Sequence, residues 1–311
     1  MKTKNLFRLA VILVSAMTLT LTSCKKDNLE KGTADPATLK QLSADENEVD
    51  GIMNDSEGDI TSTLSNNFTG LKSTEGLFCN ATIDSLAKVN DTVAIYITYK
   101  GLTCNDKFNR TGQIEIRKKA GTHWELPGAT VICKFINLKV THIATGKSVT
   151  LNGTKTFVNI SGGHRWMVGT LLTSYVEKVS GSMTASFDNG TNREWNVARQ
   201  LTYTGQPGQF NLAIDGFGTA GEYQNLVVWG TNRDGEQFYT QINQSVVHKQ
   251  TCDWNPVSGI KIHRIPADSK SATVTFGFDN NNEPVNGDNC PTHYKVDWQR
   301  NNKSGTSYLP L

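Results

Sequence analysis

The sequence predicts an all-β protein with an antiparallel body, and three features of the chain point to this fold class. From residue 77 onward, apolar and polar residues alternate with a period of two over many short segments, which is typical of strands with one buried face. Asn-Gly and Asp-Gly pairs, which favour tight hairpin turns, lie between such segments. No segment shows the strand-helix alternation of a parallel sheet. We therefore expect roughly a dozen or more strands in a β-meander or sandwich-like body of many hairpins.

The alternation defines the individual strands. Within each strand, the apolar residues share one face and the polar residues share the other, so one side of the sheet is expected to face water. The clearest segments are residues 92–99, 112–118, 181–188, 271–279 and 294–299.

Short turn signals connect these strands. A type I′ turn needs positive φ at both central residues, which Asn, Asp and Gly tolerate best. We therefore expect a two-residue hairpin at each of three places: Asn152-Gly153, Asn189-Gly190 and Asp234-Gly235.

One short helix is expected ahead of the sheet, between about residues 45 and 66. Apolar residues in this acidic stretch recur at spacings of three, four and seven, which is a helical period. Gly51 and Gly58 interrupt the pattern, so a continued flexible linker is the alternative. The apolar positions are Val49, Ile52, Met53, Ile60 and Leu64.

The first 23 residues have the features of a secretory signal peptide. Basic residues precede an apolar run at 9–21 that is broken by Ser and Thr and is short for a membrane span. The segment ends in Leu-Thr-Ser-Cys at 21–24, which resembles a bacterial lipobox. This resemblance implies cleavage before Cys24 and lipid attachment to its sulfur, and an ordinary signal peptide with an incidental cysteine is the alternative.

Lipidation of Cys24 predicts a lipoprotein anchored in the outer membrane, because several acyl chains hold a protein in a bilayer without a transmembrane helix. The following Lys26-Asp27 is similar to the surface-export signal of Bacteroidota lipoproteins, although Asn28 stands where a second acidic residue is expected. A surface-exposed protein is therefore expected, and a periplasm-facing one is the alternative.

Composition divides the chain into four parts. A signal peptide (1–23) and a lipidated flexible tether (24–44) precede a short helix with a linker (45–70), and the β body (71–311) follows. Within the body, two segments echo each other: each reads cysteine, strand, Asn/Asp-rich loop with a second cysteine, and strand. The two echoing segments are 79–118 and 252–300.

The cysteines of the body follow this echo. An oxidising envelope permits disulfides, and four cysteines allow three pairings that sequence alone cannot distinguish. The flanking pattern favours Cys79 with Cys104 and Cys252 with Cys290. Cys133 lies on an apolar strand face, so a buried free thiol is expected there.

Several of these features together resemble an uncharacterised family of Bacteroidota cell-envelope lipoproteins. The resemblance spans most of residues 45–300 and implies one β-rich envelope domain, but the family has no established activity to transfer. It is carried by the acidic stretch before Cys79, the strand at 111–116, Asn192-Arg193-Glu194-Trp195, the segment 230–235 and the two-cysteine C-terminal hairpin.

The sequence offers no catalytic or metal motif. Nucleophile-elbow, zinc-protease and phosphate-loop patterns are all absent, and the histidines are scattered. The segment 279–283 begins like a calcium loop, but Pro284 and Cys290 stand where that loop needs Gly and Glu. With 31 Lys and Arg against 29 Asp and Glu, the chain lacks the basic footprint of a nucleic-acid-binding protein. We expect no cofactor, no metal and no nucleic-acid partner.

The tryptophans provide the one indication of a ligand. An exposed indole ring stacks on a sugar ring because it presents a flat apolar face with a polar handle. Trp124 and Trp166 have polar or charged neighbours, which favours exposure, so these two are the expected ligand-stacking residues.

The expected function is a non-enzymatic binding or structural role at the envelope, with a glycan or another surface component as the leading ligand hypothesis. An envelope hydrolase using carboxylates distant in sequence is the alternative, because glycoside hydrolysis needs two carboxyl groups at a suitable separation. A purely structural envelope protein is a third alternative.

Overall fold

The computed structural model describes residues 37–65, 79–85 and 90–311, and the chain divides into two units. The first unit, Met1–Thr33, lies outside the described residues, together with Cys24, the signal peptide and most of the tether. Every described residue belongs to the second unit, Ala34–Leu311. The lipidation of Cys24 therefore stays a prediction.

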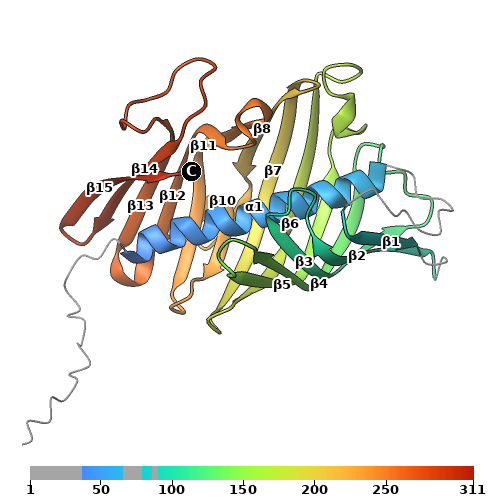
Figure 1. Ribbon diagram of the computed structural model, residues 1–311, viewed down its shortest axis with the longest axis horizontal. Coiled ribbons are helices and arrows are strands. Elements are labelled where there is room, and N and C mark those ends of the chain that lie inside the picture. The colour runs from blue at the N-terminus through green and yellow to red at the C-terminus, as the bar shows by residue number, and fades with distance from the viewer. Residues whose placement is uncertain (1–36, 66–78, 86–89) are drawn as a thin grey trace, which may run out of the picture. The chain divides into compact units, whose positions relative to one another are not determined.

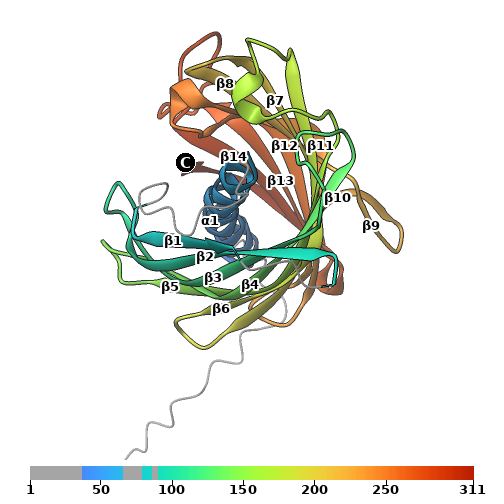
Figure 2. The same ribbon diagram turned by 90° about the vertical axis from the view of Figure 1, so that its right-hand side faces the viewer.

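The described residues form one sheet of 15 antiparallel strands and one long helix, which confirms the predicted all-β fold class. Most strands pair with the next strand in sequence, as a meander requires. The sheet curls around helix α1, which lies along its concave side (Figures 1 and 2). The strands are β1 (Ala81–Ser85), β2 (Thr92–Leu102), β3 (Phe108–Lys119), β4 (Ala129–His142), β5 (Ser148–Asn159), β6 (Ser174–Phe187), β7 (Asn192–Gln206), β8 (Gln209–Gly216), β9 (Gly218–Ala220), β10 (Tyr223–Thr231), β11 (Gln237–Lys249), β12 (Pro256–Ile265), β13 (Lys270–Phe278), β14 (His293–Arg300) and β15 (Lys303–Pro310).

Two strands share one place in the meander. β7 pairs with β10 near its start and with β8 over its second half. β11 likewise pairs with β10 near its start and with β8 near its end. β8 and β10 therefore both lie between β7 and β11, while the short β9 pairs with β10. The described part of the chain also contains three short 3-10 helices: η1 (Arg165–Met167), η2 (Gln250–Cys252) and η3 (Pro266–Asp268).

Two of the three predicted hairpins are present, but their turns are not the predicted type I′. Asn189-Gly190 connects β6 to β7, and Asp234-Gly235 connects β10 to β11. Only the glycine of each pair has positive φ, 81° and 77° respectively. A left-handed glycine that follows a turn of ordinary residues is the three-residue hairpin geometry.

The predicted hairpin at Asn152-Gly153 is wrong, because this pair lies inside β5. Gly153 has φ of 144°, and a Cβ there would come within 2.3 Å of the backbone oxygen of Ser182 on β6. The side chain of Asn152 accepts a hydrogen bond of 2.8 Å from the backbone N–H of Asn137, at a bulge of β4. A close backbone approach and a bulge are the usual reasons for glycine inside a strand.

Helix α1 spans Ala37–Ser65, so it begins earlier than the predicted start near residue 45 and includes residues 37–44 of the predicted tether. The stretch 37–44 contains no glycine or proline, and Pro36 directly before it is a usual helix start. The five apolar positions predicted for the buried face are all buried, which confirms the helical period. They pack against the concave side of the sheet with the inward side chains of the strands.

The cysteines pair as predicted. Cys79–Cys104 connects the turn before β1 to the β2–β3 loop, and Cys252–Cys290 connects η2 to the β13–β14 connection. Cys133 on β4 is buried and unpaired with another cysteine, as predicted.

Candidate functional site

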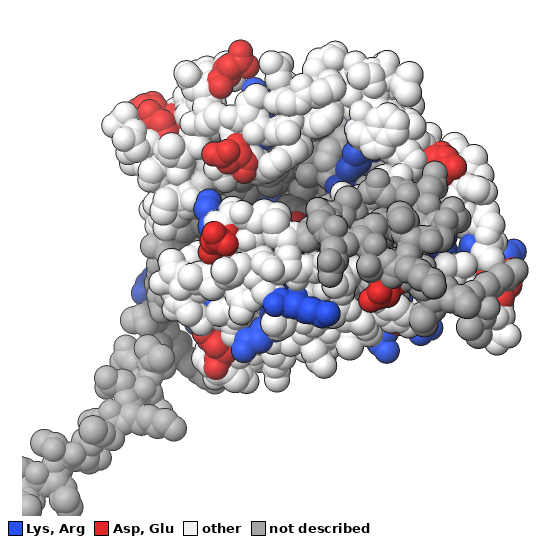
Figure 3. All heavy atoms as spheres, turned by 45° about the vertical axis from the view of Figure 1, so that its right-hand side comes forward, with Lys and Arg blue, Asp and Glu red and all other residues white. Residues whose placement is uncertain are grey.

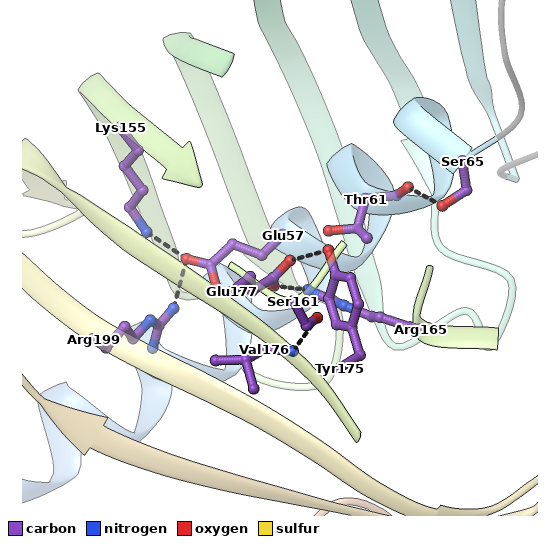
Figure 4. Close-up of polar contacts among 10 residues, drawn as sticks. All are labelled: Glu57, Thr61, Ser65, Lys155, Ser161, Arg165, Tyr175, Val176, Glu177 and Arg199. Atoms are coloured by element: carbon purple, nitrogen blue, oxygen red, sulfur yellow. Dashed lines mark hydrogen bonds and ion pairs between the residues drawn. The ribbon is translucent and has the colours of Figure 1, made fainter. Parts of the chain in front are cut away.

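A buried ion-pair cluster holds α1 against the sheet. Glu57 has a side chain that is 1% exposed, and its Oε1 accepts from Lys155 Nζ of β5 at 2.8 Å and from Arg199 Nη2 of β7 at 2.6 Å (Figure 4). Burial by itself raises the pKa of the Glu57 carboxyl, but the nearby charges of Arg199 and Lys155 outweigh burial and hold the pKa below its ordinary value. Glu57 is therefore a carboxylate in the folded protein.

A second pair fixes the next part of the helix. Asp59 Oδ2 accepts hydrogen bonds from Arg110 Nη1 of β3 at 2.7 Å and from the Tyr99 hydroxyl of β2 at 2.8 Å. The Arg110 guanidinium also lies over the Tyr99 ring, 4.5 Å from its centroid. These contacts and those of Glu57 set the rotation of α1 and therefore decide which of its residues face outward.

Two adjacent cavities lie beside the outward side of α1, and together we call them the groove. The aromatic cavity has a volume of about 480 Å³ and the second cavity about 530 Å³. Asp55 and Trp254 line both, so the cavities meet at these two residues. Gly58, Arg165, Trp166, Tyr203, Phe210, Leu212, His248 and Gln250 also line the aromatic cavity; Gly51, Ile52, Thr103, Phe108, Arg110, Val140, His142, Thr145, Lys147, Asp253 and Asn255 also line the second.

Helix α1 contributes Ile52 to the second cavity, and it contributes Gly51, Asp55 and Gly58 along one side of the groove. Spacings of four and three place these residues on one helix face. A Cβ built at Gly51 or at Gly58 meets no atom within 4 Å, so open space lies above both. The side chain of Asp55 therefore lies between two positions that carry no side chain.

Trp166 is held in the groove by its neighbour in η1. The Arg165 guanidinium makes an ion pair with Glu177 of β6, which is fully buried and also accepts from the Tyr175 hydroxyl at 3.0 Å (Figure 4). Arg165 also lies over the Tyr203 ring, 4.4 Å from its centroid. With Arg165 anchored in this way, Trp166 extends to the surface and is 57% exposed.

Trp254 is held by the turn between β11 and β12. Both Asp253 and Trp254 have left-handed backbone conformations, with φ of 55° and 60°, directly after Cys252 of the disulfide. The backbone oxygen of Trp254 bonds to His248 Nδ1 at 2.8 Å, and its N–H donates to the Lys249 oxygen at 3.0 Å. Positive φ is uncommon for a bulky residue and costs free energy. The disulfide and these hydrogen bonds hold Trp254 in the groove, where the residue is 40% exposed.

Asp55 has a raised pKa at the junction of the cavities. The surrounding protein atoms desolvate its carboxyl and raise the pKa; Arg110 opposes this, and the nearby negative charge of Asp59 adds to it. A carboxyl group in this place accepts hydrogen bonds from a ligand's hydroxyl groups when ionised and donates one when protonated.

The structure separates the two predicted stacking residues. Trp166 is exposed and lines the aromatic cavity, whereas Trp124 is 1% exposed, so the expectation for Trp124 is wrong. Its polar neighbour His123 is itself exposed, but the indole of Trp124 packs into the core. The backbone oxygen of Trp124 accepts a hydrogen bond from buried Asn159 at 2.7 Å, which fixes the loop with the ring inward.

No metal site is found among the described residues, where no three His, Cys, Asp or Glu side chains gather suitably. The calcium-like segment folds as a tight turn: Asp279 Oδ1 accepts from the backbone N–H of Asn281 at 2.8 Å and of Glu283 at 2.9 Å. The Asp279 carboxylate therefore stabilises the turn by accepting hydrogen bonds from its backbone, as Asp side chains commonly do in turns.

Three groove residues had no signal strong enough to single them out in the sequence. Trp254 follows Cys252 by two residues, and Asp55 lies midway between two glycines of a helical stretch. In the sequence, Arg165 is notable only because it directly precedes Trp166. The spacing of Asp55 between Gly51 and Gly58 was the available clue, because glycine inside a helix costs about 1 kcal/mol and needs a reason.

Comparisons with protein-family models, curated proteins and solved structures find no match to this chain. Within the described part of the chain, no helix is both long enough and apolar enough to cross a membrane.

Proposed function

We propose that this protein is a lipid-anchored glycan-binding protein of the bacterial outer membrane, attached through Cys24. The observation that carries the proposal is that two exposed tryptophans, from connections far apart in sequence, line one cavity. Trp166 and Trp254 share the aromatic cavity with Asp55 and Gln250, so flat apolar rings lie beside hydrogen-bonding groups. Sugars have apolar ring faces and hydroxyl groups, so a cavity that has both aromatic rings and hydrogen-bonding groups is suited to bind them.

The charge distribution supports a ligand other than nucleic acid. Acidic and basic side chains are interspersed on the face drawn in Figure 3, and no large patch of one sign appears there. The whole chain has a formal net charge of only +2. Nucleic-acid binding draws most of its affinity from clustered positive charge.

Replacing Trp166 or Trp254 with alanine is expected to weaken glycan binding about tenfold each, which corresponds to about 1.4 kcal/mol. Each substitution removes one stacking ring, while the Arg165–Glu177 ion pair beside Trp166 and the Cys252–Cys290 disulfide beside Trp254 stay intact. The measurement is a glycan-array screen of the full lipoprotein in detergent, followed by titration of the best glycan.

Phe217→Ala is the matched control, because Phe217 is 39% exposed and lies outside both cavities. Equal binding by the Trp166, Trp254 and Phe217 variants, or no glycan binding by the unaltered protein, would remove this proposal.

Lipid attachment has its own test. In cells fed labelled palmitate, the protein is expected to incorporate label, and Cys24→Ala is expected to abolish both the label and membrane retention. An unlabelled protein that remains in the membrane would contradict the anchor but leave the groove untouched.

An envelope hydrolase is the second candidate, and one observation favours it. Asp55 and Asp253 both line the second cavity, and the raised pKa of Asp55 suits a general acid. The glycans recovered from the binding titrations distinguish the two functions. New reducing ends that disappear with Asp55→Asn would establish hydrolysis, and intact glycans favour the binder.

A further inference from the structure

We propose that the groove binds a linear chain of at least two linked sugars that runs along α1 over Asp55, rather than a single sugar. This inference rests on the proposed glycan binding and adds the form of the ligand. One sugar unit occupies the aromatic cavity, and the next occupies the second cavity.

The continuity of the groove is the first argument. The two cavities meet at Asp55 and Trp254, and their volumes are about 480 and 530 Å³. Small-molecule pockets measure about 300–1,000 Å³, so each cavity by itself is large enough for one small unit. A ligand confined to one cavity leaves the other, of similar volume, unfilled.

The two glycines of α1 are the second argument. Gly51 lines only the second cavity and Gly58 lines only the aromatic cavity, and neither position has an atom within 4 Å of an added Cβ. Each glycine weakens the helix relative to alanine, yet no described residue packs closely against either position. Both keep a path along the helix open on the two sides of Asp55.

The chemistry of the two cavities is the third argument. The aromatic cavity is lined by the rings of Trp166, Trp254 and Phe210. The second cavity is more polar, with donors from Lys147 and His142 among its lining residues. Because Asp55 lies at the junction, its carboxyl group can bond to hydroxyl groups of both consecutive units. A chain of sugars bound along the groove would stack on rings in the aromatic cavity and form hydrogen bonds in the second cavity.

Two matched helix variants test the inference. Gly51→Leu fills the second cavity and Gly58→Leu fills the aromatic cavity, and each replaces glycine with a strong helix former at an open position. The alanine variants of both glycines serve as folding controls and are expected to unfold at the same temperature as the unaltered protein or higher. The probes are oligomers of glucose, N-acetylglucosamine, mannose and galacturonic acid, each from one to four units, titrated against the full lipoprotein in detergent.

The unaltered protein is expected to bind the dimer of its preferred series about tenfold more tightly than the monomer. Gly51→Leu is expected to abolish this gain in affinity while the affinity for the monomer is retained. Gly58→Leu is expected to weaken the binding of oligomers of every length. A monomer that binds as tightly as its longer oligomers, or a length gain that persists in Gly51→Leu, would overturn the chain ligand and leave glycan binding standing. No binding in any series would instead overturn the proposed function itself.

Discussion

Replacing Glu57 with glutamine is expected to lower the free energy of unfolding by about 3–5 kcal/mol, the usual cost of breaking a buried ion pair from one side. The glutamine keeps the shape of the side chain but removes the negative charge that lies 2.8 Å from Lys155 Nζ and 2.6 Å from Arg199 Nη2. Urea unfolding followed by tryptophan fluorescence measures the change.

Asp55→Asn is the control for this variant, because it neutralises a carboxyl of the same helix that lines the groove and takes no part in the ion pairs of Glu57. Its effect on stability is expected to stay within about 0.5 kcal/mol. A Glu57→Gln variant as stable as the Asp55 control would show that the cluster does not hold α1 to the sheet.

The same carboxyl group predicts a pH dependence. The folded-state pKa of Glu57 lies below its ordinary value of 4.5, because Arg199 and Lys155 outweigh burial. A lowered folded pKa means that the group stabilises the fold fully above the unfolded pKa, and this contribution is lost as the pH falls through the folded pKa. The unaltered protein should therefore lose more stability below pH 4.5 than Glu57→Gln, which lacks the titrating group. Parallel stability curves for the two proteins below that pH would contradict the assignment.

Removing the Cys252–Cys290 disulfide is expected to cost about 4 kcal/mol and also to weaken glycan binding. The 38-residue separation of its cysteines gives the first effect in the chain-entropy model. The second follows because Trp254, two residues after Cys252, is held in a left-handed conformation that a freed loop need not keep. The double serine variant is measured by urea unfolding and by titration of the shortest glycan that binds.

The matched control removes Cys79–Cys104, which closes a separation of 25 residues at a place away from the aromatic cavity. A loss of about 3.5 kcal/mol is expected there, with affinity at the aromatic cavity unchanged. If both double variants bind the short glycan equally well under conditions where both are folded, the disulfide does not position Trp254.

The strands and the buried face of α1 followed from local pattern. Alternation of period two placed β2, β3, β6, β13 and β14, because a residue's neighbours two positions away share its side of a sheet. The spacing of Val49, Ile52 and Met53 identified the helix face that the sheet covers. The cysteine pairs followed from flanking sequences that repeat at both ends of the body.

The groove was harder to foresee, because exposure on a curved sheet depends on what covers its concave side. A polar residue at an alternating position reads as facing water, yet Lys155 and Arg199 face the helix and are buried. In the same way, polar neighbours favoured exposure for both Trp124 and Trp166, and only the packing of their loops separated them. The pair Asn152-Gly153 is a typical turn signal, but it lies inside β5. The β6 backbone approaches Gly153 too closely for any side chain there.

The amino-acid sequence by itself determined the antiparallel class and the period of the helix, since each depends on residues close together in the chain. Its repeated flanking pattern favoured the cysteine pairs that the structure contains. Tertiary structure alone decided that Asp55, Trp166 and Trp254 line one cavity. These residues come from a helix and two strand connections separated by roughly a hundred residues each, and the curl of the sheet around α1 brings them together (Figure 2). No local period carries that information, because it arises from the ion pairs that fix the rotation of α1 and from the turns that hold the two rings.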